Sequence, residues 1–211
     1  MGPPTIRTID VAFTCTGNIC RSPMAEALLR QRLAERAPSV SIGSVGQLFD
    51  GRSAEDGAVH AMKQRGIDLT AHRSRVQTLD LLADTSLILT MERMHVREIA
   101  MLSPELFGRT FTLPEFVGLA TETGPRPSNE PLRTWVERVG ADRNPMDQLS
   151  SDPKAEVADP MGRSRRAFKA CATELDDHLA RLADLAWPLS PTQPDLAVTT
   201  IGEPHADRHR R

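Results

Sequence analysis

Tyrosine is missing from this 211-residue sequence, and aromatic residues make up only 4% of it. Cysteine is scarce too, and the odd count of three does not fit the paired framework of a small disulfide-stabilised secreted domain. No apolar run approaches the ~20 residues that a membrane-spanning helix needs. The N-terminal stretch MGPPTIRTID lacks the apolar core of a secretory signal. We therefore expect a cytoplasmic protein that does not bind membranes.

The chain also lacks a large excess of either charge and any recognisable metal-binding motif. Its formal net charge is −2, which does not favour wholesale binding to nucleic acid. Cys15, Cys20 and Cys171 form no C-x-x-C pair, and no paired histidines stand nearby at zinc-site spacing. We expect no metal, no cofactor and no nucleic-acid partner.

Four short apolar runs alternate with segments of helical periodicity. The strand-like runs are IDVAFTC, SVSIGSV, SLILTM and RTFTL. Single strands that alternate with helices form parallel sheets covered on both faces. The sequence therefore predicts an α/β fold, a three-layer sandwich whose short parallel sheet has about four strands. Ligands of such sheets bind at the carboxyl ends of the strands, where the loop after IDVAFTC falls.

One domain is expected over residues 7–186. Within it, residues 121–156 contain several Pro-, Gly- and Ser-rich stretches and read as an inserted surface excursion, with one helix at PLRTWVERV and Trp135 folding back onto the body. A long final helix places Cys171 on its apolar stripe, as expected of a core residue. Residues 187–211 are predicted to be a disordered tail.

The loop CTGNICR, from Cys15 to Arg21, carries the chemistry. Ser22 and Pro23 predict a helix start directly after it, with Ser22 as the capping residue. Successive backbone N–H groups at such a helix N-terminus can bind one phosphate-sized dianion, and Arg21 adds a planar fork for two phosphoryl oxygens. The same field favours the thiolate form of Cys15, to which the Ser22 hydroxyl can donate a hydrogen bond. Since GxxxxGK[ST] is absent, this is not a nucleotide-binding P-loop.

The spacing C-x5-R is weak evidence alone, but the full string CTGNICRSPMAE is specific. It resembles the signature of the low-molecular-weight protein-tyrosine-phosphatase family. Further matches are SVGQ at 44–47, RGIDLTAHRSR, LILTM, and ADPMGRSRRAF before the last helix. The resemblance covers roughly residues 9–119 and 157–185, leaving out 121–156 and the tail.

The resemblance implies roles for particular residues. Cys15 is the nucleophile, Arg21 holds the phosphoryl group, and Asp159 is the general acid and then the general base. We prefer Asp159-Pro160 to the rival Asp152-Pro153 because it directly precedes the last helix. The expected phosphate-binding positions are Thr16, Gly17, Asn18, Ile19, Cys20 and Arg21.

Supporting roles are implied for three more residues. Ser22 and His72 are expected to support the loop, His72 by bracing it through Asn18. Cys20 either packs in the core or traps oxidised Cys15 as a disulfide, which would spare Cys15 from irreversible oxidation.

The chain departs from the family in the collar around the substrate. Met161 and Gly162 stand where the family usually has aromatic residues, Thr16 replaces a bulkier apolar residue, and Ser86 stands where an Asp is frequent. Phe49 or Trp135 are the candidates to rebuild a wall. The phosphoryl-transfer residues are therefore all present, while selectivity for phosphotyrosine is less firmly indicated.

Three hypotheses for function follow. The first is a metal-independent phosphomonoesterase, foremost a protein-tyrosine phosphatase, that acts on a phosphorylated protein or a small phosphomonoester. The second is a thiol-dependent arsenate reductase of the same fold. The third is a catalytically weak phospho-binding or regulatory module, in which 121–156 docks a partner. We expect a monomer or a weak dimer.

Overall fold

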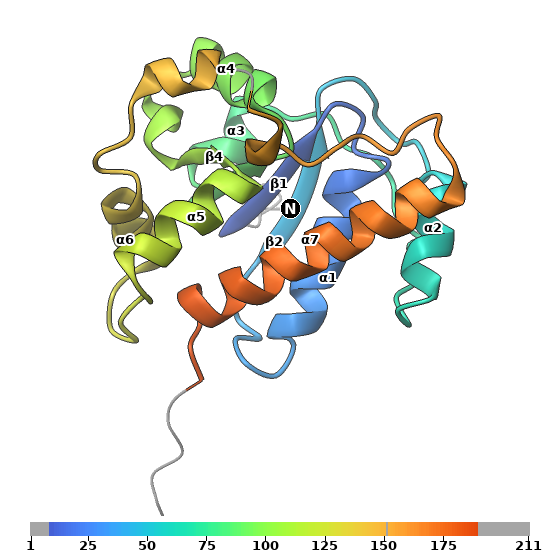
Figure 1. Ribbon diagram of the computed structural model, residues 1–211, viewed down its shortest axis with the longest axis horizontal. Helices are drawn as coiled ribbons and strands as arrows, with labels where there is room; N and C mark the ends of the chain where they lie inside the picture. Colours follow the sequence, from blue (N-terminus) through green and yellow to red (C-terminus); the bar gives the residue numbers. More distant parts are fainter. Residues whose placement is uncertain (1–8, 151, 190–211) are drawn as a thin grey trace, which may run out of the picture.

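The computed structural model describes residues 9–150 and 152–189 (Figure 1). The helices and strands follow one another in this order: β1 (Val11–Cys15), α1 (Arg21–Leu33), β2 (Ile42–Gly46), α2 (Asp56–Lys63), α3 (Leu79–Ala83), β3 (Leu87–Thr90), α4 (Arg93–Leu102), η1 (Pro104–Arg109), β4 (Thr110–Thr112), α5 (Leu113–Thr123), α6 (Leu132–Val139), η2 (Pro145–Leu149), η3 (Pro153–Ala155) and α7 (Arg165–Ala186).

The sheet has four strands in the order β2-β1-β3-β4, and every neighbouring pair is parallel. Val11 of β1 pairs with Ile42 on one side and with Leu87 on the other. All strand residues are buried, as expected for a parallel sheet that helices cover on both faces. The predicted α/β sandwich is confirmed.

Alternate residues of each strand belong to two separate cores. Phe13 and Leu89 pack in a large cluster with side chains of α1, α5 and α7. Ala12 and Ile88 belong to a smaller cluster that includes Leu82 of α3, and Ile99 of α4. This division follows from the two-residue period of a strand. In Figure 1, α1 and α7 lie side by side against one face of the sheet.

The strand order places a ligand site at the carboxyl end of β1. The chain leaves β1 for β2 at one side and later returns to β3 at the other. Loops after β1 and β3 therefore diverge to opposite faces of the sheet and leave a crevice between them. The loop that begins at Cys15 and the residues that follow Thr90 meet there.

The predicted start of α1 was wrong. The helix begins at Arg21 with Cys20 as its N-cap residue, so Ser22 and Pro23 lie inside its first turn. The Met24 N–H already donates to the Cys20 carbonyl. Ser22 therefore caps nothing, and its hydroxyl is free to take part in the site described below.

The region 121–156 is not a surface excursion throughout. Trp135 does fold back: its side chain is fully buried, and its ring meets Phe116 edge-to-face at 5.5 Å between centroids. Arg143 is also buried; its fork binds the Glu115 carboxylate, and its guanidinium stacks over the Phe111 ring at 4.1 Å. Aromatic packing and a buried ion pair thus tie this region into the core.

Trp187, the first residue of the expected tail, is only 7% exposed and packs on the main core. The remainder of the expected disordered tail, from residue 190, lies outside the described residues. Among the residues that the structure describes, no helix combines the length and apolarity needed to traverse a bilayer.

Candidate active site

The loop between β1 and α1 forms the floor of a cavity of about 340 Å³. The cavity lies at the carboxyl end of β1, as the fold predicts. Its lining comes from this loop, from the segment after β2, and from the segment before α7: Cys15, Thr16, Gly17, Ile19, Cys20, Arg21, Phe49, Arg52, Glu55, Asp159 and Met161. The structure therefore brings together the three residues predicted to carry the chemistry.

Cys15 is the last residue of β1 and is only 3% exposed. Its Sγ lies 3.1 Å from the Ser22 Oγ, in the first turn of α1. The sulfur thus lies beside a hydroxyl at the N-terminal end of α1. The expected contact between Ser22 and Cys15 is present.

Asn18 holds the loop from beneath and does not line the cavity. It is fully buried, and its backbone is left-handed, with φ of 51°. Its Nδ2 donates to the Ser22 Oγ at 2.9 Å and to the Ser44 Oγ at 2.8 Å, while its Oδ1 accepts from the Arg75 N–H at 2.9 Å. The Nε2 atom of His72 lies 2.7 Å from the Asn18 carbonyl oxygen. The brace expected of His72 is therefore in place.

Gly46, at the end of β2, allows the loop to pack directly on the sheet. A Cβ at this position would lie 2.7 Å from the Asn18 backbone nitrogen and 2.9 Å from the Gly17 carbonyl carbon. A side chain there would collide with backbone, which cannot move aside without distorting the loop. Gly46, the glycine of SVGQ, thus allows the loop from Cys15 to Arg21 to lie close to β2.

Arg21 connects the loop with two distant segments. Its side chain is 2% exposed; Nη1 contacts the Glu92 carboxylate at 2.5 Å and donates to the Val157 carbonyl at 3.1 Å. Its Nη2 lies 3.2 Å from the Asp159 Oδ2. Among the described residues, its buried Nε has no hydrogen-bond partner. The guanidinium has five N–H donors, so some of them are not used by the described residues.

The guanidinium of Arg21 stays protonated and positively charged. Burial lowers the pKa of its guanidinium, but the negative charges of Cys15 as thiolate, Asp159 and Glu92 outweigh burial and raise that pKa above its ordinary value. Arg21 is therefore a permanent cation at the floor of the cavity.

Asp159 is the acidic group that faces Arg21, and 47% of its side chain is exposed. Its other oxygen, Oδ1, accepts a hydrogen bond from the Met161 N–H at 3.2 Å. The rival Asp152 is exposed and outside the cavity lining, and its Oδ1 instead accepts from the Lys154 N–H at the start of η3. Of these two carboxylates, it is Asp159 that lines the same cavity as Cys15.

The two other cysteines are buried thiols, and all three cysteines are free. Burial, followed by the charge on Cys15, raises the pKa of the Cys20 thiol. Burial likewise raises the pKa of Cys171 to about 12. Both stay protonated at neutral pH. Cys171 packs in the core as predicted, whereas a redox role of Cys20 stays a prediction.

The collar of the cavity is built by the segment after β2 rather than by residues after Asp159 alone. Phe49 packs on Gly17: two of its ring carbons lie 3.3 Å from the position that a Cβ of Gly17 would take. The Arg52 guanidinium stacks on the Phe49 ring at 4.2 Å. Met161 also lines the cavity and is 41% exposed. Of the two aromatic candidates, Phe49 therefore lines the site, while Trp135 is in the core.

Several residues of the site were not predicted. Glu92 follows β3 and binds Arg21, and Ser44 and Arg75 hold the Asn18 side chain. His95, in α4, is fully buried, with Nε2 3.0 Å from the Thr16 Oγ1. Glu92 could have been found, because an acidic residue directly after a buried parallel strand faces the ligand edge. Ser44 and Arg75 lie in SVGQ and RGIDLTAHRSR, so the family resemblance could have pointed to them, whereas the contact of His95 depends on tertiary packing.

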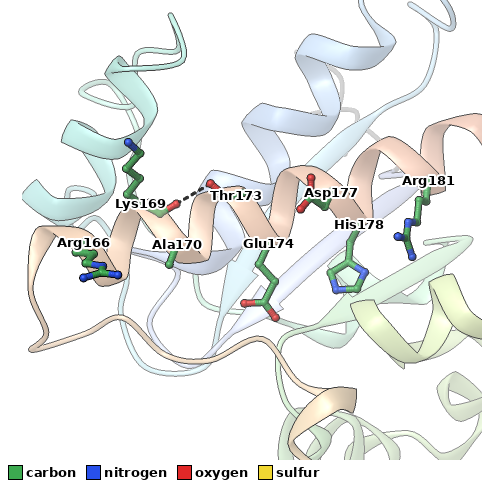
Figure 2. A pocket seen from close by; sticks show the side chains of 8 residues that line it. All are labelled: Arg166, Lys169, Ala170, Thr173, Glu174, Asp177, His178 and Arg181. Carbon is green, nitrogen blue, oxygen red and sulfur yellow. Dashed lines mark hydrogen bonds between the residues drawn. The ribbon is translucent and has the colours of Figure 1, made fainter.

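A second pocket, of about 720 Å³, runs along α7 (Figure 2). Its described lining comes from this helix alone, and most of its members are charged: Arg166, Lys169, Ala170, Thr173, Glu174, Asp177, His178 and Arg181. Burial, and next Arg181, lower the pKa of His178, and burial raises the pKa of Glu174. Figure 2 shows basic and acidic side chains interspersed along the helix. None of the predicted site residues belongs to this lining.

Comparison with known proteins shows which family this chain resembles. Residues 10–131 match the family described as low molecular weight phosphotyrosine protein phosphatase. The protein named "Probable low molecular weight protein-tyrosine-phosphatase EpsP" of Ralstonia solanacearum is 45% identical over 111 residues, or 52% of this chain and 72% of the relative. The one named "Probable low molecular weight protein-tyrosine-phosphatase AmsI" of Erwinia amylovora is 33% identical over 162 residues, which cover 76% of this chain and 85% of that protein.

Similarity to solved structures extends over most of the chain. The YwlE arginine phosphatase from Geobacillus stearothermophilus superposes with a TM-score of 0.61 at 28% identity, covering 82% of this chain and 90% of that one. The family match to residues 10–131 includes the loop from Cys15 to Arg21, the strand before it, and β3 with the start of α4. The chain therefore belongs to the low molecular weight phosphotyrosine protein phosphatase family.

Proposed function

We propose that this protein is a metal-independent phosphomonoesterase, and specifically a protein-tyrosine phosphatase, that works through a phosphocysteine on Cys15. One observation carries the proposal: Cys15, Arg21 and Asp159 line a single cavity, with Arg21 Nη2 3.2 Å from the Asp159 carboxylate. A nucleophile, a cation for the phosphoryl oxygens and a proton donor are thereby within reach of one phosphate ester.

In the first step, the Cys15 thiolate attacks phosphorus, an S–P bond forms, and the P–O bond to the leaving group breaks. The electron pair of that bond goes to the leaving oxygen, which takes its proton from the Asp159 carboxylic acid. Arg21 and the N–H groups of the loop bind the three remaining phosphoryl oxygens, where charge is spread in the transition state.

In the second step, water replaces the sulfur. Asp159, now a carboxylate, takes a proton from the attacking water, an O–P bond forms, and the S–P bond breaks to return the Cys15 thiolate. Inorganic phosphate leaves. The contact between Cys15 Sγ and Ser22 Oγ stabilises the sulfur as nucleophile and as leaving group.

Phosphotyrosine is the substrate that the collar and the family favour. Phe49 and Met161 both line the cavity and supply apolar surface, which suits a flat ring. A second candidate is phosphoarginine, because a structural neighbour of high coverage is an arginine phosphatase. The carboxylate of Glu55 at the same cavity could pair with a guanidinium.

The test is hydrolysis of para-nitrophenyl phosphate at about pH 5–7 with EDTA present. Cys15→Ser should abolish turnover and Asp159→Asn should reduce it strongly, whereas Asp152→Asn, the matched control at the other Asp-Pro pair, should leave it unchanged. Peptides that carry phosphotyrosine or phosphoarginine then decide the substrate. If reduced wild-type protein has no turnover, the proposal fails, and thiol-dependent arsenate reduction and phosphopeptide binding are the activities to measure next.

We further propose that the protein works in the cytoplasm as a monomer or weak dimer. Scarce cysteines, all free in the described structure, support a reducing compartment. Fractionation of cells and sedimentation of the purified chain test the two statements.

A further inference from the structure

The N-terminus of α4 is capped by a residue from a distant segment. The residue at the N-cap position is Glu92, but its side chain makes no capping hydrogen bond, because its carboxylate binds Arg21. Instead, Glu156 reaches the helix: its Oε1 accepts a hydrogen bond from the Arg93 N–H at 2.9 Å. A carboxylate at this position satisfies a free backbone donor and interacts favourably with the helix dipole.

Val157, the residue after Glu156, is hydrogen-bonded through both its N–H and its carbonyl. Val157 is fully buried; its N–H donates to the Met91 carbonyl at 2.8 Å, and its carbonyl accepts from Arg21 Nη1 at 3.1 Å. Glu156 and Val157 are thus attached to Arg93 and Met91, between the end of β3 and the first turn of α4. Asp159 is only two residues further along the chain.

The preceding segment is held by the same helix. Arg93, with 8% of its surface exposed, donates from Nη1 to the Ser150 carbonyl at 3.0 Å, and Arg97 donates to the Gln148 carbonyl at 2.6 Å. Helix α4 therefore binds this segment at two points before Glu156. These contacts restrict the conformations of the backbone that leads to Asp159.

We propose that Glu156 is a positioning residue for Asp159: its carboxylate, bound to the N-terminus of α4, sets the distance between Asp159 and the leaving group. The proposal rests on the proposed function, since it assumes that Asp159 donates the proton. Glu156 lies outside the cavity lining and touches no substrate. Its effect is transmitted through Val157 and the backbone that follows.

This role makes a distinctive kinetic prediction. A general acid matters most for esters whose leaving group is a poor one, and little for esters of acidic phenols. We therefore measure kcat/KM for a series from 2,4-dinitrophenyl phosphate to phenyl phosphate. For Glu156→Ala we expect a loss of about 10- to 100-fold on phenyl phosphate, as for a small misplacement of a catalytic group, and of less than about threefold on the dinitrophenyl ester.

A double variant separates positioning from general destabilisation. In the Asp159→Asn background, Glu156→Ala should add no further loss on phenyl phosphate, because the group it positions is already removed. The matched control is Glu130→Ala, which removes a carboxylate that binds Arg138 at 2.9 Å in the same region. Its leaving-group dependence should equal that of the wild type.

Glu156→Gln covers the case in which Glu156→Ala does not fold, because it keeps the length and an oxygen acceptor. We expect a smaller steepening of the leaving-group dependence in the same direction. A wild-type dependence in an active Glu156 variant would overturn the inference and leave the proposed function standing. Absence of turnover in the wild type, in contrast, would remove the proposed function itself.

Discussion

Arg21 and Asp159 form an ion pair in which Nη2 lies 3.2 Å from Oδ2, although one residue begins α1 and the other precedes α7. The same guanidinium binds Glu92, which follows β3. Arg21 thus joins the loop after β1, the residues that follow β3 and the segment before α7. Its role in the proposed mechanism is both to bind phosphate and to keep these three segments in register.

Arg21→Lys should remove most activity although the positive charge remains. A lysine offers a single point charge and cannot bind Glu92, Asp159 and phosphoryl oxygens in one plane. We expect kcat/KM for para-nitrophenyl phosphate to fall by about 10²- to 10³-fold, the scale reported for loss of one transition-state donor. Activity within about threefold of the wild type would show that the planar fork is not needed.

Ser22→Ala should slow turnover without unfolding the protein. The Oγ atom of Ser22 is 3.1 Å from Cys15 Sγ, and a hydrogen bond to a charged group is worth about 1.5–3 kcal/mol, or roughly 10- to 100-fold in rate. Ser44→Ala is the matched control, because Ser44 also accepts from Asn18, while in the described structure the hydrogen bond of the Cys15 sulfur is to Ser22. Equal kinetic losses in the two variants would mean that Ser22 acts only through Asn18.

Trp135→Ala should destabilise the whole domain. The indole is fully buried against Phe116, and its Nε1 donates to the Gly124 carbonyl at 3.2 Å. Truncation of such a side chain costs about 3–5 kcal/mol of unfolding free energy. The exposed neighbour Thr134→Ala should change it by less than about 0.5 kcal/mol in urea unfolding. A small effect at Trp135 would mean that 121–156 is a dispensable insertion after all.

Stability should fall as the pH drops below about 6.5, in part because of His95. Burial, and also the charge of Arg21, lower the pKa of His95 below its ordinary value of 6.5, although Glu92 acts in the opposite direction. Between those two pKa values the unfolded chain takes up a proton that the folded protein resists, so the unfolding free energy decreases with falling pH.

The check is urea unfolding of the wild type and of His95→Gln between about pH 7.5 and 5.5. The variant should show a smaller pH slope, by up to about one proton, or ~1.4 kcal/mol per pH unit. Some slope should remain, because burial also lowers the pKa of His178. Identical slopes would contradict the assignment to His95.

The sequence predicted the parts of the molecule that depend on local patterns. The four buried strands follow from short apolar runs, and the position of Cys15 at the carboxyl end of β1 follows from the rule for parallel sheets. The loop chemistry could be derived because nucleophile, cation and helix start are adjacent in the chain. The role of His72 was predicted from the family resemblance and not from the residues that flank it in the sequence.

Other features were missed for identifiable reasons. Helix α5 was not predicted, although Thr112 and Glu115 form a capping box at its start, and its first residue, Leu113, was assigned to the strand RTFTL. Ser22 looked like a cap, but its hydroxyl is used by Cys15 and Asn18. The sequence predicted that Trp135 folds back onto the body, but it did not predict Phe116 as the partner, because that contact depends on tertiary packing.

The most direct test of the central claim is to find the phosphoryl group on Cys15. Wild-type protein and Asp159→Asn are quenched in acid during turnover of para-nitrophenyl phosphate, and the peptide that contains Cys15 is examined by mass spectrometry. We predict a peptide heavier by one phosphoryl group, in greater amount for Asp159→Asn because removal of the base slows hydrolysis of the S–P bond. Steady turnover with no phosphoryl group on Cys15, or turnover that survives in Cys15→Ser, would contradict the account.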